Sequence, residues 1–155
     1  MPDRDAFPPL DPAARDQLIA GFNGNNAPGF GGTLGYRCVD VRRGWARLEM
    51  ESAPRVMNPA GVVHGGASFG LADASVAAAL IGLYGFGFAL LTIEMKINYL
   101  EPIFPGLVAA EAAVLRHSRR SAYAEVDVWA GGKLAARATT TYMIRPVPVV
   151  PSAGA

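Results

Sequence analysis

Residues Asn58–Leu83 decide the fold, and they read NPAGVVHGGASFGLADASVAAALIGL. Between Arg55 and Glu94, Asp73 is the only side chain that carries a full charge at neutral pH. The small and apolar residues that share its face at helical spacing predict a buried helix over residues 66–83. A lone carboxylate in such a helix is costly unless it is paired, hydrogen-bonded or used in chemistry. We therefore expect Asp73 to lie at the centre of a functional site.

The segment His64–Gly66 comes directly before this helix and has the features of an oxyanion-binding loop. Adjacent glycines let the backbone turn tightly and present bare amides to a ligand. The first turn of a helix also has unpaired N–H groups and the positive end of the helix dipole. Eight residues of helical rise place Gly65 roughly 12 Å from Asp73 along the axis. If both act on one carbonyl, we expect the second to come from another subunit.

The combination NPAGVVHGG and FGLADASVA resembles the signature of the hotdog-fold acyl-CoA thioesterases of the PaaI-like (phenylacetate-pathway) group. The resemblance extends over residues 34–144, through TIEMKINYLEP, the turn at Gly106 and the stretch RRSAYAEV. It implies an α+β fold of the hotdog type, in which a curved antiparallel β-sheet is wrapped around one long central helix. It also implies hydrolysis of an acyl-CoA, with an aromatic or a medium- to long-chain acyl group, to the free acid and CoA.

Two other functions stay open for the same scaffold. One is a non-catalytic module that binds acyl-CoA. The other is a hydratase or dehydratase of acyl thioesters, which pairs an acid with a histidine that acts on the acyl carbons. Apart from His64, the only histidine is His117, at an expected hairpin tip.

The resemblance also assigns roles to the central residues. Asp73 corresponds to the catalytic carboxylate, either as a general base that activates water or as a nucleophile that forms an anhydride. The backbone N–H of Gly65 would hold the thioester oxygen, and Asn58 would position the carbonyl or the water. The structural alternatives are turn residues at Gly65 and Asn58, and an Asp73 carboxylate that is merely satisfied by Ser68 or Ser75.

Two further residues complete the expected catalytic set. His64 either fixes its loop by a hydrogen bond or assists the departing thiolate. Thr92 matches a Ser/Thr position near the catalytic carboxylate, where a hydroxyl can hold water. As a threonine in a strand it needs no such role.

A basic cluster, formed by Arg116, His117, Arg119 and Arg120, is expected at a hairpin tip. Guanidinium groups form bidentate hydrogen bonds with phosphates, so Arg119 and Arg120 are candidates to bind the phosphates of CoA. The alternative is an ordinary solvated tip. Glu101 stands where many relatives carry a basic residue, which argues against part of the usual phosphate contact.

The rest of the chain reads as one domain with short extensions. Residues 1–33 are expected to form three parts. The first is an extended or frayed arm, and the second is a short helix that Asp11 caps and that runs from Pro12 to about Phe22. The third is a flexible loop over residues 23–32, rich in Asn and Gly (NGNNAPGFGG), which is either a border of the acyl pocket or a connector. The hotdog domain covers residues 34–145, and residues 146–155 form a flexible tail. The expected strands cover residues 34–41, 45–52, 92–99, 107–117, 122–130 and 133–144.

Two of these strands have a clear alternation. In residues 92–99, the apolar face is formed by Ile93, Met95, Ile97 and Tyr99, which alternate with Thr92, Glu94, Lys96 and Asn98. In residues 122–130, the inner face is marked by Ala122, Ala124, Val126 and Val128. Gly131-Gly132 is expected to form a tight hairpin turn.

The composition limits the partners and cofactors. Of the 155 residues, 51% are hydrophobic and only 17% charged, which predicts a surface that loses area to partner subunits. We expect a homodimer as the minimal active unit, in a dimer of dimers (a homotetramer). A net charge of +1 argues against nucleic-acid binding. The single cysteine, Cys38, is expected to be a core residue rather than a reactive thiol, and no metal or other cofactor is expected.

One apolar stretch could be mistaken for a membrane span. Residues 74–93 form a chargeless run of 20 residues. However, Gly82, Gly85 and Gly87 cluster in its middle, and no Lys or Arg flanks it, so we expect a buried helix, a turn and a strand instead. Residues 1–10 lack the apolar core of a signal peptide, so we expect a cytoplasmic protein.

Overall fold

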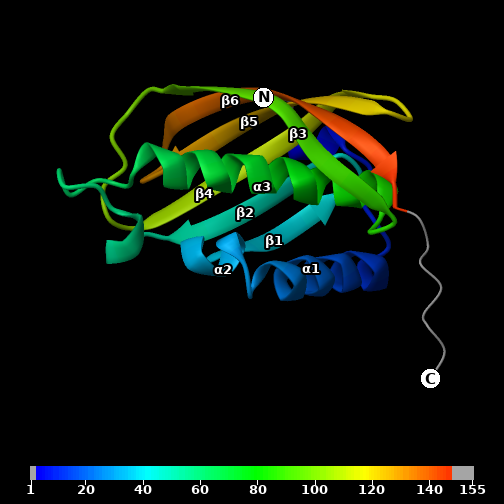
Figure 1. Ribbon diagram of the computed structural model, residues 1–155, viewed down its shortest axis with the longest axis horizontal. Helices are drawn as coiled ribbons and strands as arrows, with labels where there is room; N and C mark the ends of the chain where they lie inside the picture. The colour runs from blue at the N-terminus through cyan, green and yellow to red at the C-terminus, as the bar shows by residue number, and fades with distance from the viewer. Residues whose placement is uncertain (1–2, 148–155) are drawn as a thin grey trace.

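The computed structural model of the chain describes residues 3–147, which form a six-stranded antiparallel sheet around one long helix. In spatial order the strands are β1 (Tyr36–Arg42), β2 (Trp45–Glu51), β4 (Leu107–His117), β5 (Ser121–Ala130), β6 (Lys133–Pro146) and β3 (Phe88–Tyr99). Figure 1 shows the sheet curved around the central helix α3 (Gly65–Tyr84). The predicted hotdog arrangement is confirmed.

The helix α3 is the centre of the hydrophobic core. Residues on almost every side of it are buried, and its contacts reach β1, β2, β3, β4 and β5. A Cβ at Gly82 would overlap the carbonyl oxygen of Arg42, so the close approach of α3 to the β1–β2 hairpin requires glycine. By length and composition α3 could cross a membrane, but more than half of its apolar window is buried against the rest of the protein. It is therefore the core helix that the sequence predicted.

The strands β4 to β6 form a regular meander. The predicted inner face of β5 is buried at Ala122, Ala124, Val126 and Val128. The predicted turn at Gly131-Gly132 has φ of +55° and +75°, the left-handed conformation that a two-residue hairpin with the native strand twist requires. These predictions are confirmed.

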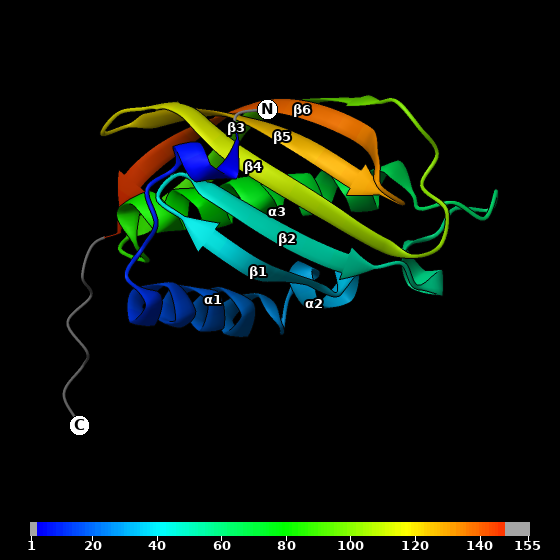
Figure 2. The ribbon, with the colours of Figure 1, turned by 180° about the vertical axis from the view of Figure 1, so that it is seen from behind.

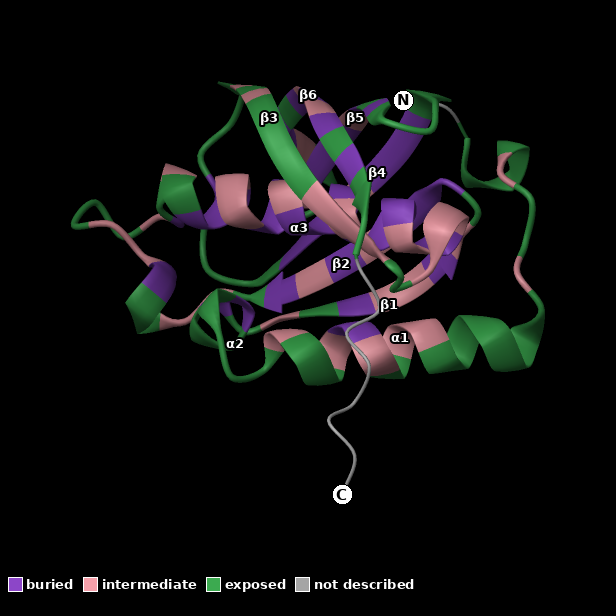
Figure 3. Ribbon diagram, turned by 45° about the vertical axis from the view of Figure 1, so that its right-hand side comes forward, coloured by how far each residue is buried: buried purple, intermediate pink, exposed green. Residues whose placement is uncertain are grey.

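The strand β3 lies at one edge of the sheet and contains a β-bulge between Thr92 and Glu94. The prediction that Ile93 shares an inner face with Met95 and Ile97 is wrong. The bulge shifts the alternation by one residue, so Thr92 faces α3 while Ile93 is 57% exposed. Figure 3 shows β3 as largely exposed or half-buried along its length.

The loop that we expected over residues 23–32 is mostly helical. The helix α1 (Pro12–Asn26) is capped by Asp11 as predicted but continues to Asn26, and α2 (Phe30–Leu34) follows. The asparagines that suggested a loop make specific hydrogen bonds. The side chain of Asn23 pairs with both backbone groups of Cys38, and the Asn26 amide donates to the Phe22 carbonyl.

The N-terminal arm is docked rather than frayed, from Asp3 onward. It forms a short 3₁₀ turn, η1 (Arg4–Ala6), and Figure 2 shows this turn against the outer side of the sheet. The Arg4 guanidinium forms an ion pair with Asp40 and lies 5.7 Å from the ring centre of Trp45. A second short turn, η2 (Pro54–Val56), follows β2. Most of the predicted tail, residues 148–155, lies outside the described residues.

Candidate active site

The carboxylate of Asp73 accepts two hydrogen bonds from hydroxyl groups on the neighbouring strands. The Tyr142 hydroxyl, on β6, donates to Asp73 Oδ1 at 2.6 Å. The Thr92 hydroxyl, on β3, donates to the same oxygen at 2.8 Å. Both bonds are to a charged acceptor, so each is stronger than a bond between neutral groups. The lone charge of the helix is therefore satisfied by partners on two strands.

Neither serine that could have satisfied this carboxylate does so. The hydroxyl of Ser75 donates to the Ala72 carbonyl at 2.6 Å, and that of Ser68 donates to the Gly65 carbonyl at 3.3 Å. Both bonds go back to the preceding turn of the helix, as serines inside helices often do. This leaves Tyr142 and Thr92 as the side chains that position Asp73.

The environment of Asp73 is partly desolvated. Burial raises the pKa of Tyr142, and the negative charge of Asp73 raises it further. The pKa of Tyr36, on β1, is also raised, first by burial and then by Asp73. Both phenols are thus neutral at ordinary pH, and an ion–dipole contact is worth more in such surroundings than in water.

The β-bulge explains how Thr92 reaches the helix. Thr92 and Tyr142 are cross-strand partners at the last regular pair before the bulge. On the other side of the bulge, the Thr140 hydroxyl donates to the Glu94 carbonyl at 2.6 Å. Bulges often re-aim side chains next to active sites, and here the bulge brings two hydroxyls together over one carboxylate.

The glycine loop lies at the start of α3. His64 is the N-cap of the helix, and its Nδ1 accepts a hydrogen bond from the Gly66 N–H at 2.9 Å. This contact supports the loop-fixing role of His64. Within residues 3–147 the N–H of Gly65 has no acceptor, and it points from the positive end of a 20-residue helix. The N–H group is thus free to receive an oxygen atom from a ligand.

Tyr99 holds this loop from the end of β3. Its hydroxyl donates to the carbonyl of Gly65 at 2.8 Å. A Cβ at position 65 would lie 3.1 Å from the Tyr99 ring, which is tighter than ordinary packing. The glycine therefore allows the close contact that fixes the start of the helix.

Asn58 closes its own loop and still keeps donors available. Its Oδ1 accepts from the backbone N–H groups of Ala60 at 2.9 Å and Val62 at 3.4 Å. No hydrogen bond among the described residues uses its side-chain NH₂ group. The turn role is therefore present, and the amide donors could still orient a substrate.

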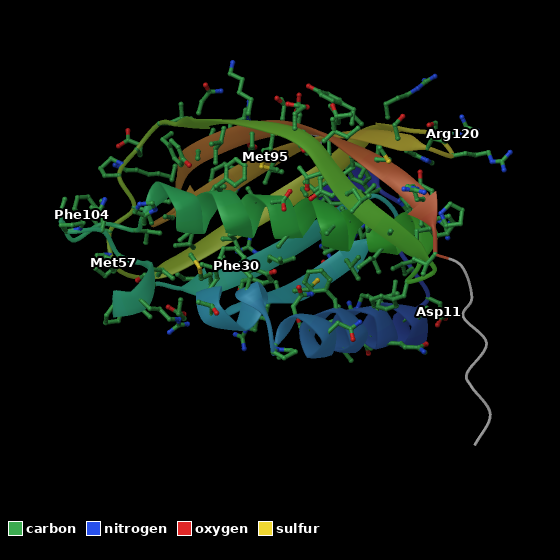
Figure 4. All side chains as sticks on the ribbon, viewed as in Figure 1. Asp11, Phe30, Met57, Met95, Phe104 and Arg120 are labelled. Carbon is green, nitrogen blue, oxygen red and sulfur yellow. The ribbon has the colours of Figure 1, made fainter. Side chains whose placement is uncertain are left out.

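The basic hairpin tip borders an open groove of about 1300 Å³. The apolar lining comes from Tyr84, Phe88, Ile93, Met143, Ile144 and Pro146, and the polar lining comes from Ser118, Arg119, Arg120 and Arg145. Figure 4 shows the side chain of Arg120 projecting from the tip of the β4–β5 hairpin. A groove with an apolar floor and three guanidinium groups suits an amphipathic ligand with phosphates.

The other members of the predicted basic cluster do not line the groove. His117 contacts the Tyr84 hydroxyl at 3.1 Å, and their rings are perpendicular, so it attaches the hairpin to the end of α3. Arg116 and Glu101 are exposed.

Cys38 is buried, and burial raises the pKa of its thiol to about 12, which supports its prediction as a core residue.

The sequence-predicted residues form two groups within one chain. Asp73 and Thr92 are in contact. His64 and Gly65 form the N-terminus of α3, and Asn58 closes the loop that leads into it. Three contributors were missed, namely Tyr142, Tyr99 and Arg145. A buried tyrosine needs a partner for its hydroxyl, so the inward position of Tyr142 between Thr140 and Ile144 was the available signal. Within residues 3–147 no cluster of three His, Cys, Asp or Glu side chains could hold a metal.

The arrangement of a curved antiparallel sheet around a single helix, with a glycine loop at the helix start and a carboxylate in its middle, defines a hotdog-fold protein of the thioesterase type. The sequence pattern of the thioesterase superfamily matches residues 60–136. A conserved protein from Pseudomonas aeruginosa is 32% identical with a TM-score of 0.71, over 85% of this chain and 99% of that one. A mutant of the phenylacetic acid degradation protein PaaI from Thermus thermophilus is 30% identical with a TM-score of 0.67, over 74% and 96%.

A thioesterase from Haemophilus influenzae has the same fold, with a TM-score of 0.77 and 23% identity over 83% of this chain and 90% of that one. The chain belongs to the thioesterase superfamily, and the predicted resemblance to its PaaI-like group is confirmed. As a member of this superfamily, it has the enzyme class of a thioester hydrolase.

We expect turnover to depend on the negative charge of Asp73. Asp73→Asn keeps the shape of the side chain but is neutral, so we expect kcat to fall on the order of 10²- to 10⁴-fold with an unchanged melting temperature. The matched control is Asp16→Asn, on the exposed face of α1, which should keep wild-type activity. Wild-type kcat in a folded Asp73→Asn variant would contradict the assignment.

Proposed function

We propose that the protein is an acyl-CoA thioesterase that hydrolyses its substrate to a free acid and CoA. The observation that carries the proposal is the Asp73 carboxylate, which has hydroxyl donors on one oxygen in a mostly buried helix. A carboxylate held in this way can take a proton from water or attack a carbonyl carbon itself. The acyl group that we propose is aromatic or of medium to long chain.

The chemistry divides between the two groups of residues. The N–H of Gly65 stabilises the oxyanion that forms when the thioester carbonyl is attacked, and the dipole of α3 adds to this effect. Asn58 orients the carbonyl or the water through its amide N–H groups. Asp73 either accepts the proton of the attacking water or forms an acyl anhydride that water then cleaves. The C–S bond breaks and the thiolate leaves as CoA.

We also propose that each site is shared across a homodimer, because Gly65 and Asp73 are roughly 12 Å apart along α3. The edge strand β3 supports a second copy as the partner. It exposes Leu91, Ile93 and Tyr99, which are 47%, 57% and 53% exposed. A long edge with exposed large hydrophobic residues favours pairing with another chain unless it is covered. The homodimer in turn would form a dimer of dimers.

The groove beside β3 is the proposed site for the nucleotide part of CoA. Arg119 and Arg120 reach the phosphates, as the sequence suggested, and Arg145 adds a third guanidinium. Glu101 is exposed and is not part of the proposed phosphate-binding site. The CoA is a substrate, and the proposed reaction uses no metal ion or redox cofactor. The proposed compartment is the cytoplasm.

The hydratase alternative is less well supported by the geometry. It needs a histidine near the carboxylate, and His117 is too far away, because it contacts Tyr84, which lies eleven residues further along α3 and roughly 16 Å away by helical rise. In a shared site the histidine would have to be His64, whose Nδ1 already accepts a hydrogen bond from the Gly66 N–H. The binding-module alternative differs from the proposal in turnover alone. The first experiment below distinguishes both alternatives from the proposed thioester hydrolysis.

Thiol release tests the proposed reaction most simply. Purified protein is incubated with a panel of saturated straight-chain and aromatic acyl-CoAs, and free thiol is measured with a chromogenic disulfide. We expect hydrolysis of at least one class, and a hydratase would release no thiol from a saturated acyl-CoA. The proposed function would be overturned if the folded wild-type protein released no thiol from any substrate of the panel and Asp73→Asn behaved in the same way.

The groove predicts a separate effect on substrate binding. Replacement of both Arg119 and Arg120 by Ala should raise KM for acyl-CoA while kcat changes little, because remote phosphates bind equally in the ground and transition states. An acyl-pantetheine, which lacks the nucleotide, should show no such rise. The control is Arg37→Ala, at an exposed position on β1. Equal effects on the two substrates would show that the hairpin tip is only solvated.

A further inference from the structure

We propose that Tyr142 is a positioning residue for the Asp73 carboxylate, which it holds with Thr92 so that Oδ2 is the reacting oxygen. The inference rests on the proposed function, since it assigns a role to a residue that acts through Asp73. It also assigns different roles to the two carboxylate oxygens. The proposed function, in which Asp73 is either a base or a nucleophile, does not say which oxygen reacts.

The two oxygens of Asp73 have different environments. Oδ1 accepts from Tyr142 at 2.6 Å and from Thr92 at 2.8 Å. A carboxylate oxygen has about two lone-pair sites, so Oδ1 is saturated. Within residues 3–147 no hydrogen-bond donor reaches Oδ2. The lone pairs of Oδ2 are therefore available to accept a proton from water or to attack carbon.

The hydrogen bond from Tyr142 has a fixed direction. The Tyr142 hydroxyl lies 2.6 Å from Asp73 Oδ1 and 2.9 Å from the Asp73 carbonyl oxygen. Both atoms are acceptors only, so the single phenolic proton is shared between them. Burial and the charge of Asp73 raise the pKa of Tyr142, which keeps that proton in place. Tyr142 is thus a permanent hydrogen-bond donor to Asp73.

The same contacts fix the geometry of residue 73. Because Tyr142 bonds both the side chain and the main chain of Asp73, it ties the helix turn and the carboxylate to β6 together. Tyr142 as a whole is only 2% exposed, so it is held by the core of its own chain. Thr92 is exposed on the edge strand and is the less constrained of the two donors. Tyr142 is therefore the dominant anchor.

The test is Tyr142→Phe, which removes one oxygen atom and keeps the ring. We expect kcat to fall roughly 10- to 100-fold with little change in KM, because a hydrogen bond to a charged group is lost. Unchanged kcat, or a rise in KM in place of a fall in kcat, would overturn the inference.

A matched control and a double variant separate positioning from stability. Tyr123→Phe, at an exposed site on β5, should leave both kcat and KM unchanged. In an Asp73→Asn background, Tyr142→Phe should cause no further loss of kcat, because the group through which it acts is gone. A full additional loss in that background would show that Tyr142 only supports the fold.

A third variant keeps the inference testable if Tyr142→Phe does not fold. Thr92→Val lies at an exposed position and removes the other donor to Oδ1, so it should lower kcat by a smaller factor with little change in KM. Unchanged kcat in Thr92→Val would overturn the inference in that case. Full activity of Asp73→Asn would instead refute the proposed function, whereas an inactive Asp73→Asn with a normal Tyr142→Phe would refute only this inference.

Discussion

A carboxylate in the middle of the core helix is held by the hydroxyls of Tyr142 and Thr92 on the strands that cover it. Without these donors, the cost of burying part of the Asp73 charge would oppose the packing of α3 against β3 and β6. The interaction thus links stability and chemistry. The same contacts that allow an acidic side chain inside an apolar helix also leave one of its oxygens available for reaction.

The edge strand β3 joins the parts of the site. Its bulge turns Thr92 toward Asp73, and its far end brings Tyr99 to the carbonyl of Gly65 at the start of α3. One strand therefore spans both halves of the proposed machinery. Its outer side exposes Leu91 and Ile93, which a single chain does not cover. A second copy would both cover this edge and complete a site whose halves are too far apart in one chain.

The sequence predicted what depends on pattern and missed what depends on tertiary contacts. The lone charge of Asp73 and the glycines before it were visible without a structure, and the alternation in the strands located the sheet. The bulge at Ile93 was not predictable, because alternation continues through it in the sequence. From the sequence, Tyr142 looked like one more residue of a core face. Only the fold brings its hydroxyl to Asp73, which lies 69 positions earlier. Asn23 was interpreted as a loop residue, because its hydrogen bond to Cys38 is likewise non-local and cannot be seen in the sequence.

The shared site is the central claim, and a mixed dimer tests it most directly. Chains with Asp73→Asn and chains with Asn58→Ala are co-expressed with different tags, and the mixed dimer is purified by both. In a shared site, the intact Asp73 of one chain meets the intact Asn58 of its partner, so one site is whole and the other has both lesions. The account predicts activity that approaches half that of the wild-type dimer, although each parent homodimer is crippled. A mixed dimer as inactive as its parents would contradict it, because each site would then belong to a single chain.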